Sequence, residues 1–159
     1  MAEHPIRDRW TLPIVALAAI LGIAAIELRP LLDPHPLLLA APDGACDLQT
    51  GPCSGRFPQG GAVTLEIAPR PIAPLAPLDL RVATQGLDPY SVQIDFVGLE
   101  MDMGYNRPTL TAVGPGRYRG EGTLPICVRD RMAWEARVLI STADGLLAAP
   151  FRFETVRRR

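Results

Sequence analysis

Met101 and Met103 are the residues of this chain whose types and spacing most clearly suggest chemistry. They lie two positions apart at the end of a segment that alternates like a β-strand, so both thioethers face the same side. Thioether and thiolate sulfur selects Cu(I) among the common biological metals. Methionine also fills irregular gaps in protein cores, and a Met-x-Met pair alone does not separate these two roles.

Two further sulfur-containing residues could complete such a site. Cys127 and Met132 lie in the loop before a predicted strand that carries Trp134, and loops at strand ends are where β-sandwiches carry sites. The alternative for Cys127 is a disulfide partner or a small buried side chain. If the segments meet at one end of the domain, the sequence predicts a Cu(I) site formed by Met101, Met103, Cys127 and Met132, with Cys53 as a further possible ligand.

Cys46 and Cys53 bracket a loop of turn-forming residues and are the first candidates for a disulfide. An oxidising compartment would permit that bond, or a bond between either of them and Cys127. Because the chain has three cysteines, one thiol stays unpaired within the chain. The spacing alone does not select among these pairings.

The sequence disfavours catalysis and nucleic-acid binding. His4 and His35 are the only histidines and both precede the predicted domain, so nucleophilic chemistry has no histidine base there. Glu100 and Asp102 alternate to the side opposite Met101 and are expected in solvent. The formal net charge of −1 gives no basic surplus for nucleic acid, and no phosphate-binding glycine loop or zinc signature is present. We expect a protein that is not an enzyme, with no small-molecule substrate.

An apolar segment precedes these residues and predicts a membrane anchor. Residues 10–28 contain an uncharged run, and roughly 20 apolar residues cross a bilayer core. Arg7 and Arg9 precede the run, which favours a cytoplasmic N-terminus. A cleaved signal peptide is the alternative, but its apolar region is usually shorter. We expect a single-pass protein of the bacterial inner membrane, with 1–9 in the cytoplasm and the remainder in the periplasm.

The predicted anchor would contact membrane lipid, and a transmembrane helix of another protein is a possible second partner. Ala18, Gly22 and Ala25 place small residues on one face of the helix. Small residues let two helices approach closely within a membrane.

The rest of the chain predicts an all-β domain. Residues 29–55 read as a proline-rich linker with the cysteine loop, 56–156 as an antiparallel β-sandwich and 157–159 as a basic tail. A change of alternation at Gly98 places Leu99 on the side of Met101 and Met103, which predicts a β-bulge. The period-two segments are Val63–Ile67, Leu78–Val82, Val92–Phe96, Arg117–Thr123, Ala133–Thr142 and Leu147–Glu154.

Three elements of this domain occur in a familiar order. They are Met101-Asp-Met-Gly-Tyr-Asn106, then Gly114-Pro-Gly-Arg-Tyr118-Arg-Gly120, then the strand that begins Met132-Ala-Trp134. Over about residues 60–155 the chain resembles the YtkA-like and FixH-like domains of bacterial membrane-anchored proteins. The Cys46/Cys53 loop and the segment Leu124-Pro-Ile-Cys127 depart from that pattern.

The resemblance implies an immunoglobulin-like β-sandwich preceded by one N-terminal transmembrane helix. It also implies a link to the assembly of cbb3-type cytochrome oxidase and to its copper supply, so a respiratory complex or a copper-delivery protein is the expected partner. An accessory subunit without metal is the alternative function. Tyr105, Asn106 and Arg107 would then be contact residues, because aromatic and arginine side chains are favoured at interfaces.

Overall fold

A computed structural model describes the 159-residue chain except for residues 1–12, 21, 23–37, 43–45, 127–128 and 157–159. The chain forms two compact units, Met1–His35 and Pro36–Arg159. In the first unit, residues 13–20 and 22 are helical. No helix within the described residues is long and apolar enough to cross a membrane. Most of the predicted anchor, including Ala25, lies outside the described residues, as do His4 and His35.

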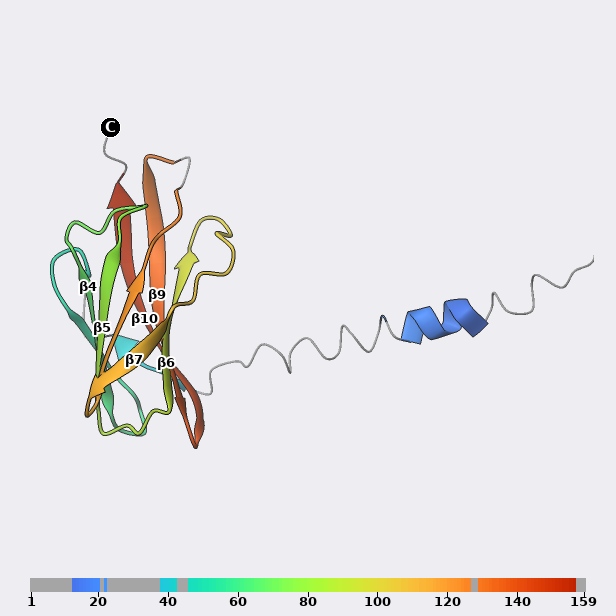
Figure 1. The fold of residues 1–159 in the computed structure, drawn as a ribbon, viewed down its shortest axis with the longest axis horizontal. Coiled ribbons are helices and arrows are strands. Elements are labelled where there is room, and N and C mark those ends of the chain that lie inside the picture. Colours follow the sequence, from blue (N-terminus) through green and yellow to red (C-terminus); the bar gives the residue numbers. More distant parts are fainter. Residues whose placement is uncertain (1–12, 21, 23–37, 43–45, 127–128, 157–159) are drawn as a thin grey trace, which may run out of the picture. The chain divides into compact units, whose positions relative to one another are not determined.

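The second unit is all-β (Figure 1). Period-two alternation of apolar and polar residues produces its strands because alternate side chains point into the core. All six predicted strands are present, and the prediction of a mostly antiparallel, sandwich-like domain is confirmed. The strands are β1 Leu38–Leu39, β2 Ala41–Pro42, β3 Cys53–Arg56, β4 Ala62–Ala68, β5 Leu78–Gln85, β6 Ser91–Gly98, β7 Thr109–Gly114, β8 Arg117–Gly122, β9 Arg131–Thr142 and β10 Gly145–Val156.

The strands pair in the order β1-β10-β9-β6-β7-β8-β5-β4-β3-β2. One layer contains β1, β10, β9 and β6, and the other contains β8, β5, β4, β3 and β2. Strand β7 joins the layers, because its start pairs with β6 and its end with β8. On the opposite side of the sandwich the chain also passes from one layer to the other. There β1 pairs with β10, β2 pairs with β3, and Ala40 lies between β1 and β2. Few strand edges are left unpaired by this arrangement.

The core lies between the two layers and is centred on β9. Trp134 is fully buried, and its Nε1 donates a hydrogen bond of 2.9 Å to Thr155 Oγ1, so the polar group of the indole is satisfied. Phe96 from β6 and Leu80 from β5 are buried in the same cluster. The inward side chains of β9 are those that the alternation predicts: Trp134, Ala136, Val138 and Ile140.

The folded unit begins before the predicted domain start at residue 56. Ala40, Leu48 and Cys53 are buried in the core cluster, although the sequence places them in the linker. Strands of two to four residues and a buried turn give no period-two signal, which is why the pattern does not reveal them.

The predicted bulge at Gly98 is wrong. The pairing of β6 with β9 is continuous up to the pair Gly98–Trp134, and the chain then enters the loop 99–108. The change of alternation instead marks the point where the strand ends. The bulge that the structure contains lies in β7, between Ala112 and Gly114, in a strand that the sequence did not predict.

The sandwich has two different ends. We call the loop end the one formed by 46–52, 69–77, 99–108, 123–126 and 129–130, where β4, β6, β8 and β10 finish. We call the turn end the opposite one, formed by the short connections 57–61, 86–90, 115–116 and 143–144. The loop 99–108 projects beside the end of β6 in Figure 1. Met101, Met103 and Met132, the predicted methionine ligands, belong to the loop end.

Candidate metal centre

Two of the predicted methionine ligands meet beside Gly98, at the last residue of β6. A β-carbon built on Gly98 would lie 2.5 Å from Met132 Cε and 2.8 Å from Met103 Cγ. It would also lie 2.6 Å from the carbonyl oxygen of Met101. The side chains of Met103 and Met132 therefore fill the space that any larger residue at position 98 would need. Glycine is required here for room, so the packing of the methionines depends on it.

The three methionines differ in burial. Met132 is 2% exposed at the start of β9, whereas Met101 and Met103 are partly buried and pack against the core cluster. The backbone N–H of Leu99 donates to the Ala133 carbonyl at 3.0 Å, which holds the loop start against β9. The loop thus places thioethers between the core and the surface, where an incoming ion could reach them.

Polar contacts fix the loop 99–108 to the strands. The carbonyl of Asn106 accepts a hydrogen bond of 3.0 Å from Phe96 N–H, and its Nδ2 donates to the Thr123 carbonyl at 2.9 Å. Arg107 Nη2 donates to Asp95 Oδ2 at 3.1 Å. Asn106 and Arg107, predicted as interaction residues, are therefore engaged within the domain in this structure.

Tyr105 is the exposed member of that predicted trio. Its side chain is 81% exposed, and the Arg107 guanidinium lies 5.2 Å from its ring centroid. Leu99 and Ile126 at the same end are 43% and 61% exposed. Large exposed apolar side chains at one end of a domain suit contact with another molecule.

The segment before β9 belongs to the same end as the Met-x-Met pair. Arg129 Nη1 donates to Glu100 Oε2 at 2.7 Å, so Glu100 has an ion-pair partner and does not simply face solvent. Asp102 also has a local role, because its Oδ1 accepts from the N–H of Gly104 at 2.8 Å. Cys127 lies outside the described residues.

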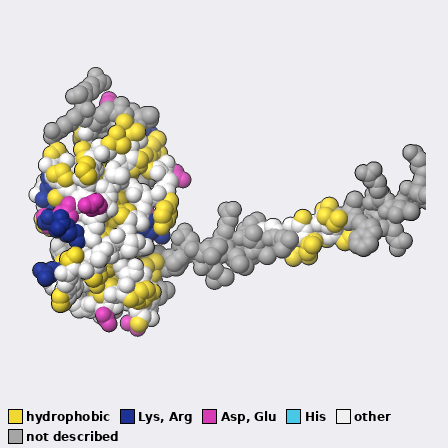
Figure 2. Space-filling view, in the orientation of Figure 1, with side chains coloured by type: hydrophobic (Ala, Val, Ile, Leu, Met, Phe, Trp, Pro, Cys, Tyr) yellow, Lys and Arg dark blue, Asp and Glu magenta, His cyan; other side chains and the backbone are white. Residues whose placement is uncertain are grey.

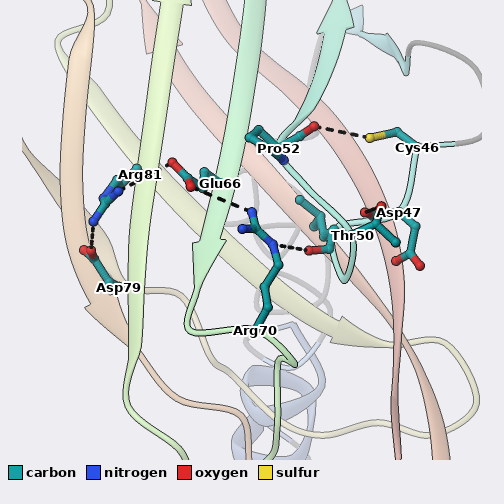
Figure 3. Close-up of polar contacts among 9 residues, drawn as sticks. Cys46, Asp47, Thr50, Pro52, Glu66, Arg70, Asp79 and Arg81 are labelled. Atoms are coloured by element: carbon teal, nitrogen blue, oxygen red, sulfur yellow. Dashed lines mark hydrogen bonds and ion pairs between the residues drawn. The ribbon is translucent and has the colours of Figure 1, made fainter.

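Cys46 and Cys53 form a disulfide with a Cα–Cα distance of 5.7 Å. Of the alternatives left open by the sequence, this pairing is the one in the structure, and Cys53 in it has no thiol to offer a metal. Cys46 lies on the loop that precedes β3 (Figure 3). The disulfide closes a loop whose Leu48 is fully buried, so the loop forms part of the core.

Side chains outside the disulfide also hold this loop. Gln49 Nε2 donates to the carbonyls of Glu154 at 2.6 Å and Ile72 at 3.2 Å, and its Oε1 accepts from Ile72 N–H at 2.8 Å. Arg70 Nε donates to the Leu48 carbonyl at 3.1 Å. The cysteine loop is thereby tied to both layers at the loop end.

The outer side of β9 carries a buried charged residue, Glu135, three positions after Met132. Glu135 is 6% exposed and accepts from Arg137 Nε at 2.6 Å and from Arg152 Nε at 3.2 Å. Burial alone raises the pKa of Glu135, but the hydrogen bonds and charges of the two arginines outweigh it, and the pKa lies below its ordinary value. The carboxylate is therefore ionised at neutral pH.

Gly98 is the site residue that the sequence did not identify by its role. An isolated glycine within a strand pattern indicates either a bulge or a close approach of other atoms, and at Gly98 it marks a close approach.

Among the described residues, no three His, Cys, Asp or Glu side chains are grouped to hold a metal ion. Comparisons with protein-family models, curated proteins and solved structures found no match to the chain.

Proposed function

We propose that this chain is a membrane-anchored periplasmic protein that binds Cu(I) at the loop end of an immunoglobulin-like sandwich. The observation that carries the proposal is the meeting of Met103 and Met132, from two separate segments, beside Gly98. The carbonyl oxygen of Met101 approaches the same point, and the side chain of Met101 packs against the same core cluster, so it is the third proposed ligand. A set of thioethers fits Cu(I), because soft sulfur ligands select this ion over harder metals.

The protein would handle copper for the assembly of a respiratory oxidase, as the resemblance to YtkA-like and FixH-like proteins implies. Support for the immunoglobulin-like class comes from the layer that pairs β6, β9 and β10 and from the strand β7 that joins the two layers. Met101, Met103 and Met132 would hold the ion, and Cys127 remains a predicted ligand. The thioethers stay neutral at every physiological pH, so binding would not require a proton to leave them.

A competition titration tests the metal site. The full chain in mild detergent is titrated with Cu(I) under anaerobic conditions with ascorbate, against a chromogenic Cu(I) chelator. We expect about one tightly bound Cu(I). Met103→Leu combined with Met132→Leu keeps the volume but removes two sulfur ligands, and should weaken binding about tenfold or more.

Three further variants sharpen this test. Leu99→Ala, in the same loop, is the matched control and should leave the affinity unchanged. Gly98→Ala keeps every sulfur but should weaken binding, because its β-carbon displaces both methionines. Cys127→Ser, which leaves the Cys46–Cys53 disulfide intact, shows what Cys127 adds. Copper binding that is equal in the wild type and in the double methionine variant would sink the proposal.

The anchor has its own support and test. The described side chains of residues 13–20 are exposed, among them Ile14 at 64% and Ile20 at 62%, and such a helix needs an apolar environment. We expect the chain to stay with the membrane fraction after alkaline carbonate extraction. Release by carbonate would argue for the cleaved-signal alternative.

An accessory role without metal is the second candidate. It is favoured by the exposed apolar side chains Leu99, Tyr105 and Ile126 at the loop end. This function predicts co-purification with a respiratory membrane complex in mild detergent, and its loss in Tyr105→Ala. Isolation of a lone monomer under those conditions would count against it.

A further inference from the structure

A shallow hollow of about 370 Å³ opens on the outer face of the second layer, away from the methionines. In Figure 2, basic and acidic side chains gather on this flank of the domain, over β4 and β5. The hollow extends from Pro52 and Thr64, across Ala83, to Val113 and Arg117. Its surface is therefore contributed by strands that lie side by side, β4, β5, β8 and the end of β7.

The strand register explains why the face is hollowed. Arg117 is opposite Ala83 on β5 and Gly114 on β7, two residues with almost no side chain. A β-carbon on Gly114 would stand 2.8 Å from Arg117 Nη2, so the guanidinium lies over the glycine. The bulge in β7 leaves Val113 without a partner in the register and 58% exposed. On its β7–β8 side the hollow is thus bordered by Arg117 and by the projecting Val113, and Glu66, Arg81 and Arg119 line it as well.

The neighbouring arginines on this face are already neutralised. Arg119 binds Asp79 through two hydrogen bonds, from Nε at 2.7 Å and from Nη2 at 3.1 Å. Arg81 donates to the same carboxylate at 2.6 Å and lies 3.6 Å from Glu66, as Figure 3 shows. Hydrogen bonding by Arg119 is the main reason that the pKa of Asp79 lies below its ordinary value. These two cations therefore have little charge left to offer a ligand.

Arg117 differs from them in having no hydrogen-bond or ion-pair partner within the described part of the chain. Its cross-strand neighbours carry no carboxylate, because they are Ala83 and Gly114. The unpaired guanidinium of Arg117 lies beside the apolar floor of the hollow, which Ala83 and Val113 form. This arrangement is complementary to a ligand with one carboxylate and an adjacent apolar group.

We propose that this hollow binds an extended segment of a partner polypeptide. A carboxylate of the segment pairs with Arg117, and a neighbouring apolar side chain lies between Ala83 and Val113. This surface is independent of the proposed copper site and lies on strands that the site does not use.

The surrounding charges favour this partner over a densely anionic surface. Glu66 and Asp79 pair with Arg81 and Arg119 on this face, so Arg117 is the unpaired cation here among the described residues, whereas a phosphate-rich backbone or lipid layer is bound by a cluster of such cations. A single acidic side chain can approach Arg117 while its neighbours cover the apolar floor. The hollow is also open and extends across several strands, as an extended peptide requires.

The test uses the full isotope-labelled chain in zwitterionic micelles and NMR titration with a capped peptide. The peptide carries one glutamate flanked by leucine and valine, and the matched peptide carries glutamine in its place. We expect the glutamate peptide to shift the amides of Ala83 and Arg117, and the glutamine peptide to bind about tenfold more weakly. Arg117→Gln should weaken the glutamate peptide by a similar factor.

Two variants separate charge from shape. Ala83→Phe keeps Arg117 but fills the hollow, and should also abolish binding; residue 83 is exposed, so the domain should tolerate the change. Arg131→Gln, which removes an exposed arginine paired with Glu154, should have no effect. Equal affinity for both peptides, or for wild type and Arg117→Gln, overturns the proposal. Shifts caused only by phosphatidylglycerol added to the micelles would overturn it in favour of lipid.

Discussion

The two ends of the sandwich are held together by different parts of the chain. The turn end relies on backbone hydrogen bonds, such as Thr84 N–H to the Gly116 carbonyl at 2.8 Å and Tyr90 N–H to the Ser141 carbonyl at 3.0 Å. The loop end has backbone hydrogen bonds as well, such as Leu99 N–H to the Ala133 carbonyl at 3.0 Å, and adds side-chain contacts that include the Cys46–Cys53 disulfide. Short glycine turns need no side chain to close them, whereas long loops do.

This difference shows where the fold leaves room for function. The loops of the loop end can vary in sequence if the side chains that hold them to the strands are kept. These contacts are Gln49 to Glu154, Asn106 to Thr123 and Glu100 to Arg129. Met101, Met103 and the exposed Tyr105 lie between the anchored residues Glu100 and Asn106 of the loop. The turn end instead has strict backbone requirements. Substitutions at the two ends should therefore fail for different reasons.

The largest expected effect comes from removing the buried side chain of the cysteine loop. Leu48→Ala should lower the free energy of unfolding by about 3 kcal/mol, because Leu48 is fully buried and the substitution leaves a cavity. Denaturant unfolding followed by circular dichroism measures the change. Leu99→Ala at the same end, where the side chain is 43% exposed, should cost less than about 1 kcal/mol. Equal losses would show that the loop is not part of the core.

Opening the disulfide should have the next largest effect. Cys46→Ser combined with Cys53→Ser should destabilise the domain by about 2.5 kcal/mol, the loop-closure entropy of a ring with a sequence separation of 7. The loop end should also exchange its amide hydrogens faster, while the turn end stays protected. Hydrogen-exchange mass spectrometry compares the two ends in one experiment. Uniform loss of protection would contradict a division between the ends.

The sequence predicts the regular part of this fold better than its loop end. The alternation around Val63, Val92 and Trp134 identifies strands correctly, because each spans enough residues to show a period of two. Strand β7 escapes prediction because it changes layers and contains a bulge, so its burial does not alternate. The two-residue strands β1 and β2 are too short to show any period.

The candidate site was predictable in its residue types but not in its contacts. The Met-x-Met spacing points to residues 101 and 103, and the proximity of Met132 follows only from the pairing of β6 with β9. The role of Gly98 depends on which atoms approach it in space. The spacing of residues along the chain carries no information about those contacts. The same holds for Asn106 and Arg107, whose partners Thr123 and Asp95 lie in other segments.

A pair of glycine substitutions compares the ends directly. Gly116 at the turn end has φ 61°, and a β-carbon there would stand 2.6 Å from the Thr84 carbonyl oxygen. Gly104 at the loop end has φ 73°, but a β-carbon would meet nothing within 4 Å. Gly116→Ala should therefore cost about 2 kcal/mol and Gly104→Ala about 1 kcal/mol, the left-handed backbone alone. The midpoints of denaturant unfolding measure both. A reversed order would mean that the turn can shift to admit a side chain.

The smallest predicted effect concerns the ion pairs of β9 beside the loop end. Glu135→Gln should lower the free energy of unfolding by about 1 kcal/mol at pH 7, because Arg137 and Arg152 lose their shared carboxylate. The pKa of Glu135 in the folded chain lies below its ordinary value of 4.5, so folding favours the ionised form. Its contribution is complete above that value and is lost as the pH falls below it.

The difference between wild type and Glu135→Gln should therefore shrink toward zero in unfolding curves recorded from pH 7 down to about pH 3. Glu154→Gln is the matched control, because its partner Arg131 is 72% exposed and solvent screens that pair. It should cost less than about 0.5 kcal/mol at any pH. A loss at Glu135 that stays constant with pH would assign the effect to packing of the side chain on β9. A loss that follows the carboxylate's titration would show that charge pairing on β9 stabilises the sandwich near its loop end.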